Sequence, residues 1–154
     1  MKLAEALSQR ADATRRVEQL RSRIVANARF QEGEEPTEDA AALLAEAGNV
    51  ASQLEDLIRR INRTNASTQI GPEGTITDAL ARRDVLRIRH SVVTAAADAA
   101  AGRGHGVRQL RSELKMLSAL PVAQLRSQAD VLARQVREID VLIQQSNWQF
   151  DLLE

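Results

Sequence analysis

Apolar residues recur at alternating steps of three and four residues along most of this chain. This spacing is typical of helices that pack against other helices through a seam of side chains. The first such run indicates a helix over about Leu3–Phe30, in which Arg10 and Asn27 are polar members of an otherwise apolar seam. Gly33 and Pro36 then interrupt the pattern, so we expect the helix to end before them.

A second apolar run extends over about residues 43–68. Thr37 is the expected N-cap of this helix, because Glu38 and Asp39 would then lie in its first turn. Negatively charged side chains in the first turn interact favourably with the positive end of the helix dipole. The turn at Gly71–Gly74 should end it. Because an α-helix rises about 1.5 Å per residue, a helix of about thirty residues is a rod of roughly 45 Å.

The remaining chain indicates two further helices, separated by a segment without clear helical periodicity. Thr77 is the expected N-cap of a third helix that reaches about Ala101. Val107–Leu120 favours a non-helical structure, an extended strand or a hairpin, because its apolar residues alternate with polar ones. Pro121 suits the first turn of a last helix, whose regular seam continues to Phe150.

These elements define the predicted fold class, an all-α bundle of about four long helices with a short extended segment or hairpin before the last helix. The composition supports it, because aromatic residues make up only 2% of the chain and strands favour aromatic and β-branched side chains. A length of 154 residues suits one domain, so we expect a single helical domain over residues 1–154.

The third helix carries more apolar surface than one neighbouring helix would cover. Two strips lie about 100° apart on it, with Arg82 and Arg89 between them. The strips are Ala81, Val85, Ile88, Val92 and Ala96, and Ala79, Leu86, Val93 and Ala97. Either this helix is central in a single copy of the chain, or one strip is a subunit interface. Because rods of the expected length exceed a compact domain of this size, we favour a homo-oligomer.

Charge and composition argue against several classes of function. Basic and acidic residues are balanced at 21 each, so no nucleic-acid partner is expected, since such binding needs a basic excess. The chain has no cysteine and two histidines, so we expect no disulfide, metal site or cofactor. The Met1–Glu5 segment lacks the apolar stretch of a signal peptide, and no run approaches the roughly 18 apolar residues of a membrane span. We therefore expect a cytoplasmic protein without a membrane partner.

Five polar residues interrupt the pattern and are candidates for a ligand site or an interface: Asn62, Asn65, Arg82, Asp84 and Arg89. Asparagine is a mediocre helix former, so two in one helical turn could bind a small polar ligand or fix the register of a helix pair. The arginines between apolar strips need a carboxylate or water to offset their desolvation, and we favour salt bridges over an anion site. No nucleophile with an oriented base is evident, so we assign no catalytic residue and lean towards a protein that is not an enzyme.

Three segments carry a resemblance to a known family: Ile61-Asn62-Arg63-Thr64-Asn65, Leu80–Leu86, and Ser146-Asn147-Trp148 with Asp151-Leu152-Leu153. In these segments the chain resembles small bacterial helical proteins of unknown function that are sometimes labelled septicolysin-like. The resemblance implies a helical fold that assembles into higher oligomers, with a hexamer as the suggested form, and it transfers no active site. The label implies a pore-forming toxin, which a chain with one tryptophan and no evident export signal supports poorly.

The sequence leaves three functions open. The favoured one is a structural or interaction protein that forms a homo-oligomer. The others are a membrane-active, pore-forming protein and a small-molecule or anion-binding protein that would use the polar candidates above. Light scattering, dye release from liposomes and thermal-shift screening with anions would separate the three.

Overall fold

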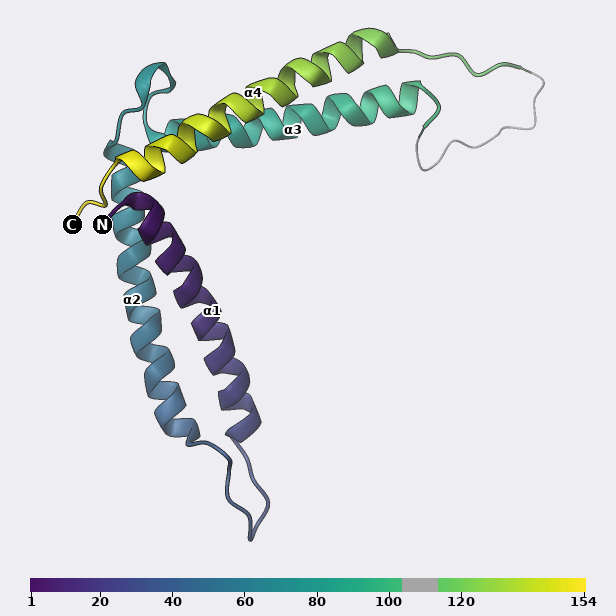
Figure 1. Ribbon diagram of the computed structural model, residues 1–154. Coiled ribbons are helices and arrows are strands. Elements are labelled where there is room, and N and C mark those ends of the chain that lie inside the picture. The colour runs from purple at the N-terminus through teal and green to yellow at the C-terminus, as the bar shows by residue number, and fades with distance from the viewer. Residues whose placement is uncertain (104–113) are drawn as a thin grey trace. The chain divides into compact units, whose positions relative to one another are not determined.

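A computed structural model of the protein describes residues 1–103 and 114–154. Within these ranges the fold consists of four long α-helices and one short 3₁₀ helix (Figure 1). The α-helices are α1 (Leu3–Asn27), α2 (Ala40–Ser67), α3 (Ile76–Ala100) and α4 (Val122–Gln149), and the 3₁₀ helix is η1 (Gly71–Glu73). The described residues contain no strand. The predicted all-α fold with four long helices is therefore confirmed.

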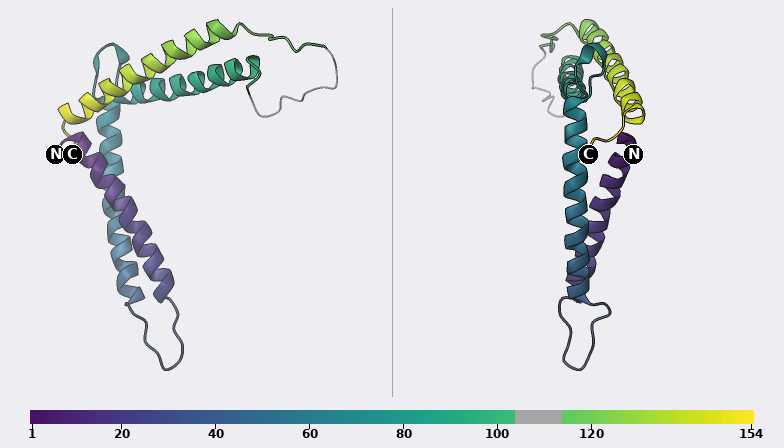
Figure 2. Two further views of the ribbon diagram at one scale, coloured as in Figure 1. Left: turned by 45° about the vertical axis from the view of Figure 1, so that its right-hand side comes forward. Right: turned by 90° about the vertical axis from the view of Figure 1, so that its left-hand side faces the viewer.

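Contacts group the residues into two compact parts, each built around one helical hairpin. The first part holds residues 1–68 and 145–154, and its helices α1 and α2 lie side by side (Figure 1, Figure 2). The second part holds residues 69–144. Two ion pairs join α3 to α4 there, Arg87 to Asp140 at 2.9 Å and Arg126 to Asp98 at 2.7 Å. The single domain expected over residues 1–154 stays a prediction.

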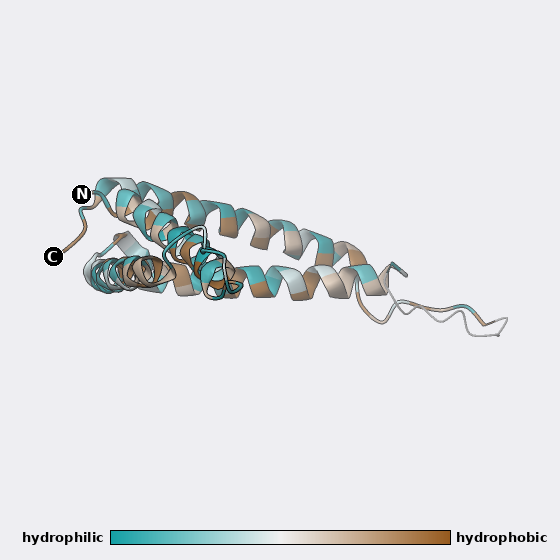
Figure 3. Ribbon diagram, turned by 90° about the horizontal axis from the view of Figure 1, so that it is seen from below, coloured by the Kyte–Doolittle hydropathy of each residue, from teal (hydrophilic) through white to brown (hydrophobic). Residues whose placement is uncertain are grey.

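Seam residues form the core of the first part. Leu3, Ala6 and Leu20 of α1 and Leu43 and Ile61 of α2 are all buried. Figure 3 shows the apolar and polar residues that alternate along the helices. All five lie within the two apolar runs that predicted these helices, and steps of three and four residues keep one side of a helix turned towards its neighbour.

Polar side chains shape the connection between α1 and α2. The Asn27 amide donates to the Arg23 carbonyl at 2.9 Å, and its side-chain oxygen accepts the backbone N–H of Glu38 at 3.0 Å. The Arg23 guanidinium also donates to the Glu38 carboxylate, with 2.9 Å between Nε and Oε2, and this hydrogen bond holds the pKa of Glu38 below its usual range. α1 ends at Asn27 rather than near Phe30, and the Asn27 side chain bridges the helix end to the residues before α2.

The N-cap of α2 is Asp39 and not Thr37, so that prediction was wrong. The Asp39 carboxylate accepts the backbone N–H groups of Ala41 and Ala42 at 2.9 and 3.2 Å. Because both the backbone and the side chain of Glu38 are held by α1, the helix begins only after Glu38. Thr37 therefore lies outside the helix.

The N-cap of α3 is Thr75 rather than the predicted Thr77, so α3 begins two residues early. The Thr75 hydroxyl accepts the Asp78 backbone N–H at 3.2 Å, and the Asp78 carboxylate accepts the Thr75 backbone N–H at 2.8 Å, which together make a capping box. Gly74 precedes the cap with a φ of 82°, and a Cβ at this position would lie 2.6 Å from an Asp78 carboxylate oxygen. Glycine is thus required here by both the backbone conformation and the close approach.

The predicted non-helical segment Val107–Leu120 lies partly outside the described residues. Its described portion, residues 114–120, contains no helix, as predicted, and no strand. α4 then begins at Val122, and the carbonyl of Pro121 accepts the Leu125 backbone N–H at 3.0 Å. Pro121 therefore directly precedes the first turn instead of lying within it.

Residues from both ends of the described chain meet in the first part (Figure 1). The backbone N–H of Leu3 donates to the Phe150 carbonyl at 3.0 Å, and the backbone N–H of Leu152 donates to the Met1 carbonyl at 2.8 Å. These bonds fasten the segment after α4 to the start of α1.

Candidate functional site

The two apolar strips predicted on α3 differ in exposure. In the strip that contains Leu86 and Ala97 these two residues are buried, with 6% and 0% of their surface exposed, and Val93 is half-buried. The other strip is uncovered, because Val85, Ile88 and Val92 remain 48%, 62% and 63% exposed. We call this second strip the outer strip and define it as Ala81, Val85, Ile88, Val92 and Ala95, since Ala95 is exposed where the predicted Ala96 is half-buried. Within its own part of the protein, α3 is covered on one side only.

Charged residues border the outer strip. Arg82 forms an ion pair with Glu73 of η1, which agrees with the favoured explanation of this arginine as a salt-bridge partner. Asp84 pairs with its neighbour Arg83 at 2.9 Å, and 62% of the Asp84 side chain stays exposed. Arg89 makes no hydrogen bond or ion pair with any residue in the described ranges. The outer strip is therefore flanked by an accessible carboxylate and by a guanidinium that has no partner among residues 1–103 and 114–154.

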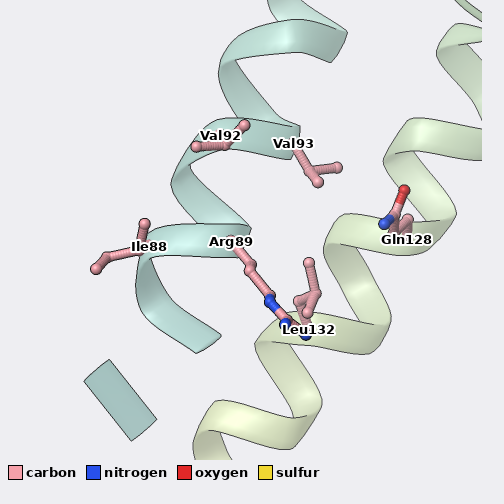
Figure 4. A pocket seen from close by; sticks show the side chains of 6 residues that line it. All are labelled: Ile88, Arg89, Val92, Val93, Gln128 and Leu132. Carbon is pink, nitrogen blue, oxygen red and sulfur yellow. The ribbon is translucent and has the colours of Figure 1, made fainter. Parts of the chain in front are cut away.

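A shallow groove of about 350 Å³ adjoins the outer strip between α3 and α4. Its lining residues are Ile88, Arg89, Val92, Val93, Gln128 and Leu132. Figure 4 shows Arg89 and Val93 pointing towards α4, while Ile88 points away from that helix. The lining is apolar except for Arg89 and Gln128, and it contains no carboxylate. Such a groove can accept an apolar side chain whose neighbour carries a negative charge.

The two asparagine candidates lie on α2, in the first part of the protein, whereas Arg82, Asp84 and Arg89 lie on α3 in the second part. Asn62 is exposed and Asn65 is half-buried. Neither asparagine side chain makes a hydrogen bond within residues 1–103 or 114–154. Since Arg82 and Asp84 also have separate partners, the five residues share no hydrogen-bond network in the described structure.

Thr64 is a buried polar residue that is not among the five candidates from the sequence. It is fully buried, its hydroxyl donates to the Arg60 carbonyl at 2.9 Å, and the same hydroxyl accepts the backbone N–H of Leu153 at 3.0 Å. The guanidinium groups of Arg60 and Arg63 donate to the carbonyl oxygens of Leu153 and Glu154 at 3.1 and 3.3 Å. This end of α2 thus holds the segment after α4, and Thr64 lies within the apolar run over about residues 43–68 that predicted α2.

Two other kinds of site find no support in the described part of the chain. No three histidine, aspartate or glutamate side chains come together there in a way that could hold a metal ion. Among the helices of the same ranges, none combines the length and the apolar character that crossing a membrane would need.

Comparison with known proteins gives relatives without an assigned activity. The model of a family of unknown function, DUF6847, matches residues 10–152. Among solved structures, the chain is similar to a functionally unknown conserved protein from Corynebacterium diphtheriae, with 38% sequence identity, a TM-score of 0.90 and 99% of each chain covered. No curated protein matches it.

Proposed function

This chain belongs to the family of unknown function DUF6847. From the exposed apolar surface of α3, we propose that the protein has a structural or interaction role and forms a homo-oligomer through the outer strip. The observation that carries the proposal is the exposure of Val85, Ile88 and Val92, each between 48% and 63%. Single exposed apolar residues are ordinary on a protein surface. Three β-branched residues at steps of three and four on one helix face are instead typical of a face that meets another helix.

The area of the outer strip limits how tight the association can be. Full burial of a valine or isoleucine side chain contributes about 1.5–3 kcal/mol. Covering the exposed half of six such side chains, three from each copy, contributes on the order of 7 kcal/mol, which is comparable to the entropic cost of bringing two proteins together. We therefore expect an oligomer that depends on protein concentration, unless further surfaces join the contact.

The proposal also accounts for the charged residues better than a ligand site does. Arg82 is already paired with Glu73, and Asp84 is a carboxylate that would repel an anion, so these two residues do not concentrate positive charge for a small anion. Exposed salt bridges of this kind contribute little to stability. The uncovered apolar strip is therefore the main surface of α3 that would gain from contact with a partner.

Light scattering and sedimentation over a wide concentration range test the proposal. We expect the wild-type mass to rise above the 16.9 kDa of one copy as the concentration increases. Ile88→Lys should shift the protein towards the single copy, because it places a charge in the centre of the strip. A mass of six copies would match the hexamer that the resemblance suggests.

Val141→Lys is the matched control, because Val141 is an apolar residue of α4 that is 55% exposed and lies in the same part of the protein. This variant should associate like the wild type. A wild-type mass of one copy at every concentration would refute the proposal. An association that Ile88→Lys leaves unchanged would also refute it, since the contact would then lie elsewhere.

A further inference from the structure

The outer strip of α3 has the register of a coiled-coil seam. Its members follow one another at steps of four, three, four and three residues. In heptad notation, Ala81, Ile88 and Ala95 occupy d positions, and Val85 and Val92 occupy a positions. The three largest side chains of the seam are also well exposed, at 48% or more. The register therefore identifies which residues must flank the seam.

The two flanks of the seam carry opposite charges. The e positions hold Arg82 and Arg89, and the g positions include Asp84 and Asp98. Arg82 is engaged by η1, and Asp98 forms an ion pair with α4. Asp84 has only its sequence neighbour as an ionic partner, and Arg89 has none within the described residues. One negative and one positive side chain are thus left available for a second helix.

Charges at e and g positions determine the relative direction of two paired helices. In a parallel pair in register, a g residue faces the e residue five positions further along the partner helix. Asp84 then faces Arg89 of the partner subunit, and the two-fold symmetry creates this contact twice. In an antiparallel pair, e faces e and g faces g, so arginine would meet arginine and aspartate would meet aspartate. Like charges placed together disfavour that arrangement.

We infer that two copies of the chain pair through α3 in parallel and in register, with Asp84 of each copy bound to Arg89 of the partner subunit. The inference rests on the proposed function, which requires only that the outer strip is the contact. Arg89 points towards α4 in the groove that it lines together with Ile88 and Val92 of the seam (Figure 4). Parallel pairing brings each seam residue opposite its own copy, which can be tested directly.

Single cysteines test the direction of pairing, because the chain has no cysteine of its own. Ala81 and Ala95 are exposed d positions one heptad on either side of Ile88, so their substitution should not disturb the fold. Under mild oxidation, Ala81→Cys and Ala95→Cys should each form a disulfide-linked dimer with itself, since in-register d positions approach within disulfide range. Ala123→Cys, at an exposed alanine of α4, should not form such a dimer and is the control.

Charge substitutions give an independent readout. Asp84→Arg alone and Arg89→Asp alone should each weaken self-association roughly three- to tenfold, because each replaces two attractive contacts with two repulsive ones. A mixture of the two variants should recover association. In the mixed pair, one copy carries arginine at both positions and the other carries aspartate at both, so each contact again joins opposite charges. Urea unfolding of each variant at low concentration checks that the single copy remains folded.

The outcomes separate this inference from the proposed function. If the wild type associates and Ile88→Lys weakens the association, but neither Ala81→Cys nor Ala95→Cys forms a disulfide dimer with itself, then the helices do not pair in parallel and in register, and the inference alone fails. If Ile88→Lys leaves the association unchanged, the outer strip is not the contact and both proposals fail. A wild-type protein that stays a single copy at all concentrations would likewise overturn both.

Discussion

Single polar side chains decide where the helices of this protein begin and end. Asp39, Thr75 and Asn27 each bind backbone N–H groups beside a helix end. The first N–H groups of a helix lack a carbonyl one turn earlier, so a short side chain with an oxygen in reach takes its place. The choice among neighbouring candidates depends on which residues the preceding loop has already bound.

Replacing Asp39 tests this assignment of the α2 cap. We expect Asp39→Ala to lower the free energy of unfolding by about 1 kcal/mol, because the N–H groups of Ala41 and Ala42 lose their acceptor. Urea unfolding followed by circular dichroism measures the change. Thr37→Ala is the control, since Thr37 lies outside the helix, and its effect should stay within about 0.5 kcal/mol. A larger loss in Thr37→Ala than in Asp39→Ala would contradict the assignment.

Thr64 shows why polar candidates are hard to rank from sequence. Asn62 and Asn65 attract attention because asparagine is unfavourable inside a helix. Thr64 is the buried member of the three. Its hydroxyl accepts the backbone N–H of Leu153, which is 89 residues away in the chain. No local pattern encodes a partner at that separation, so residue type alone does not reveal which of the three side chains is buried.

At the scale of elements, the spacing of apolar residues was sufficient to predict all four helices and the two-sided character of α3. The same spacing did not predict which strip of α3 would be covered by another helix, because both strips consist of alanine, valine and larger aliphatic residues. The answer depends on where α4 docks, and the Arg87–Asp140 ion pair helps to fix that position. The groove at Leu132 was missed for the same reason, since it exists only once two helices are placed.

The start of α3 should make stability depend on pH. The backbone N–H and hydroxyl of Thr75 both donate to the Asp78 carboxylate, and they hold the pKa of Asp78 below its ordinary value of 3.8. A lowered folded-state pKa means that the ionised carboxylate contributes stability above the ordinary value. That contribution is lost as the pH falls through the lower, folded-state pKa.

Comparing the wild type with Asp78→Asn isolates this contribution. The urea midpoint of the wild type should exceed that of Asp78→Asn at about pH 7, and the gap should narrow as the pH falls below about 4. In a Thr75→Val background the gap at neutral pH should be smaller, because one of the donors to Asp78 is gone. A gap that stays constant from neutral to acid pH would show that the capping carboxylate is not the cause.

At the scale of the whole molecule, the first compact part is completed by residues far apart in the sequence. Helices α1 and α2 supply its hairpin, and residues 145–154 return to it from the other end of the described chain. The Lys2 ammonium lies 3.0 Å from the Asp151 carboxylate, and Leu152 donates its backbone N–H to the Met1 carbonyl. Leu152 is buried with 7% of its surface exposed, whereas its neighbour Leu153 is 45% exposed. The hairpin therefore has an apolar anchor that its own two helices do not provide.

These neighbouring leucines allow the contribution of the returning segment to be measured. Leu152→Ala should lower the free energy of unfolding by about 2–4 kcal/mol, because it removes a buried side chain and leaves a cavity. Leu153→Ala should change it by no more than about 0.5 kcal/mol, since the backbone bonds of Leu153 to Thr64 and Arg60 survive. Hydrogen exchange shows where in the protein the stability is lost. In Leu152→Ala, amides of α1 and α2 should lose more protection than amides of α3, which belongs to the other compact part. If the two variants lowered the free energy of unfolding by the same small amount, backbone hydrogen bonds alone would hold the segment. A loss of hydrogen-exchange protection confined to α3 would mean that Leu152 does not anchor the first part.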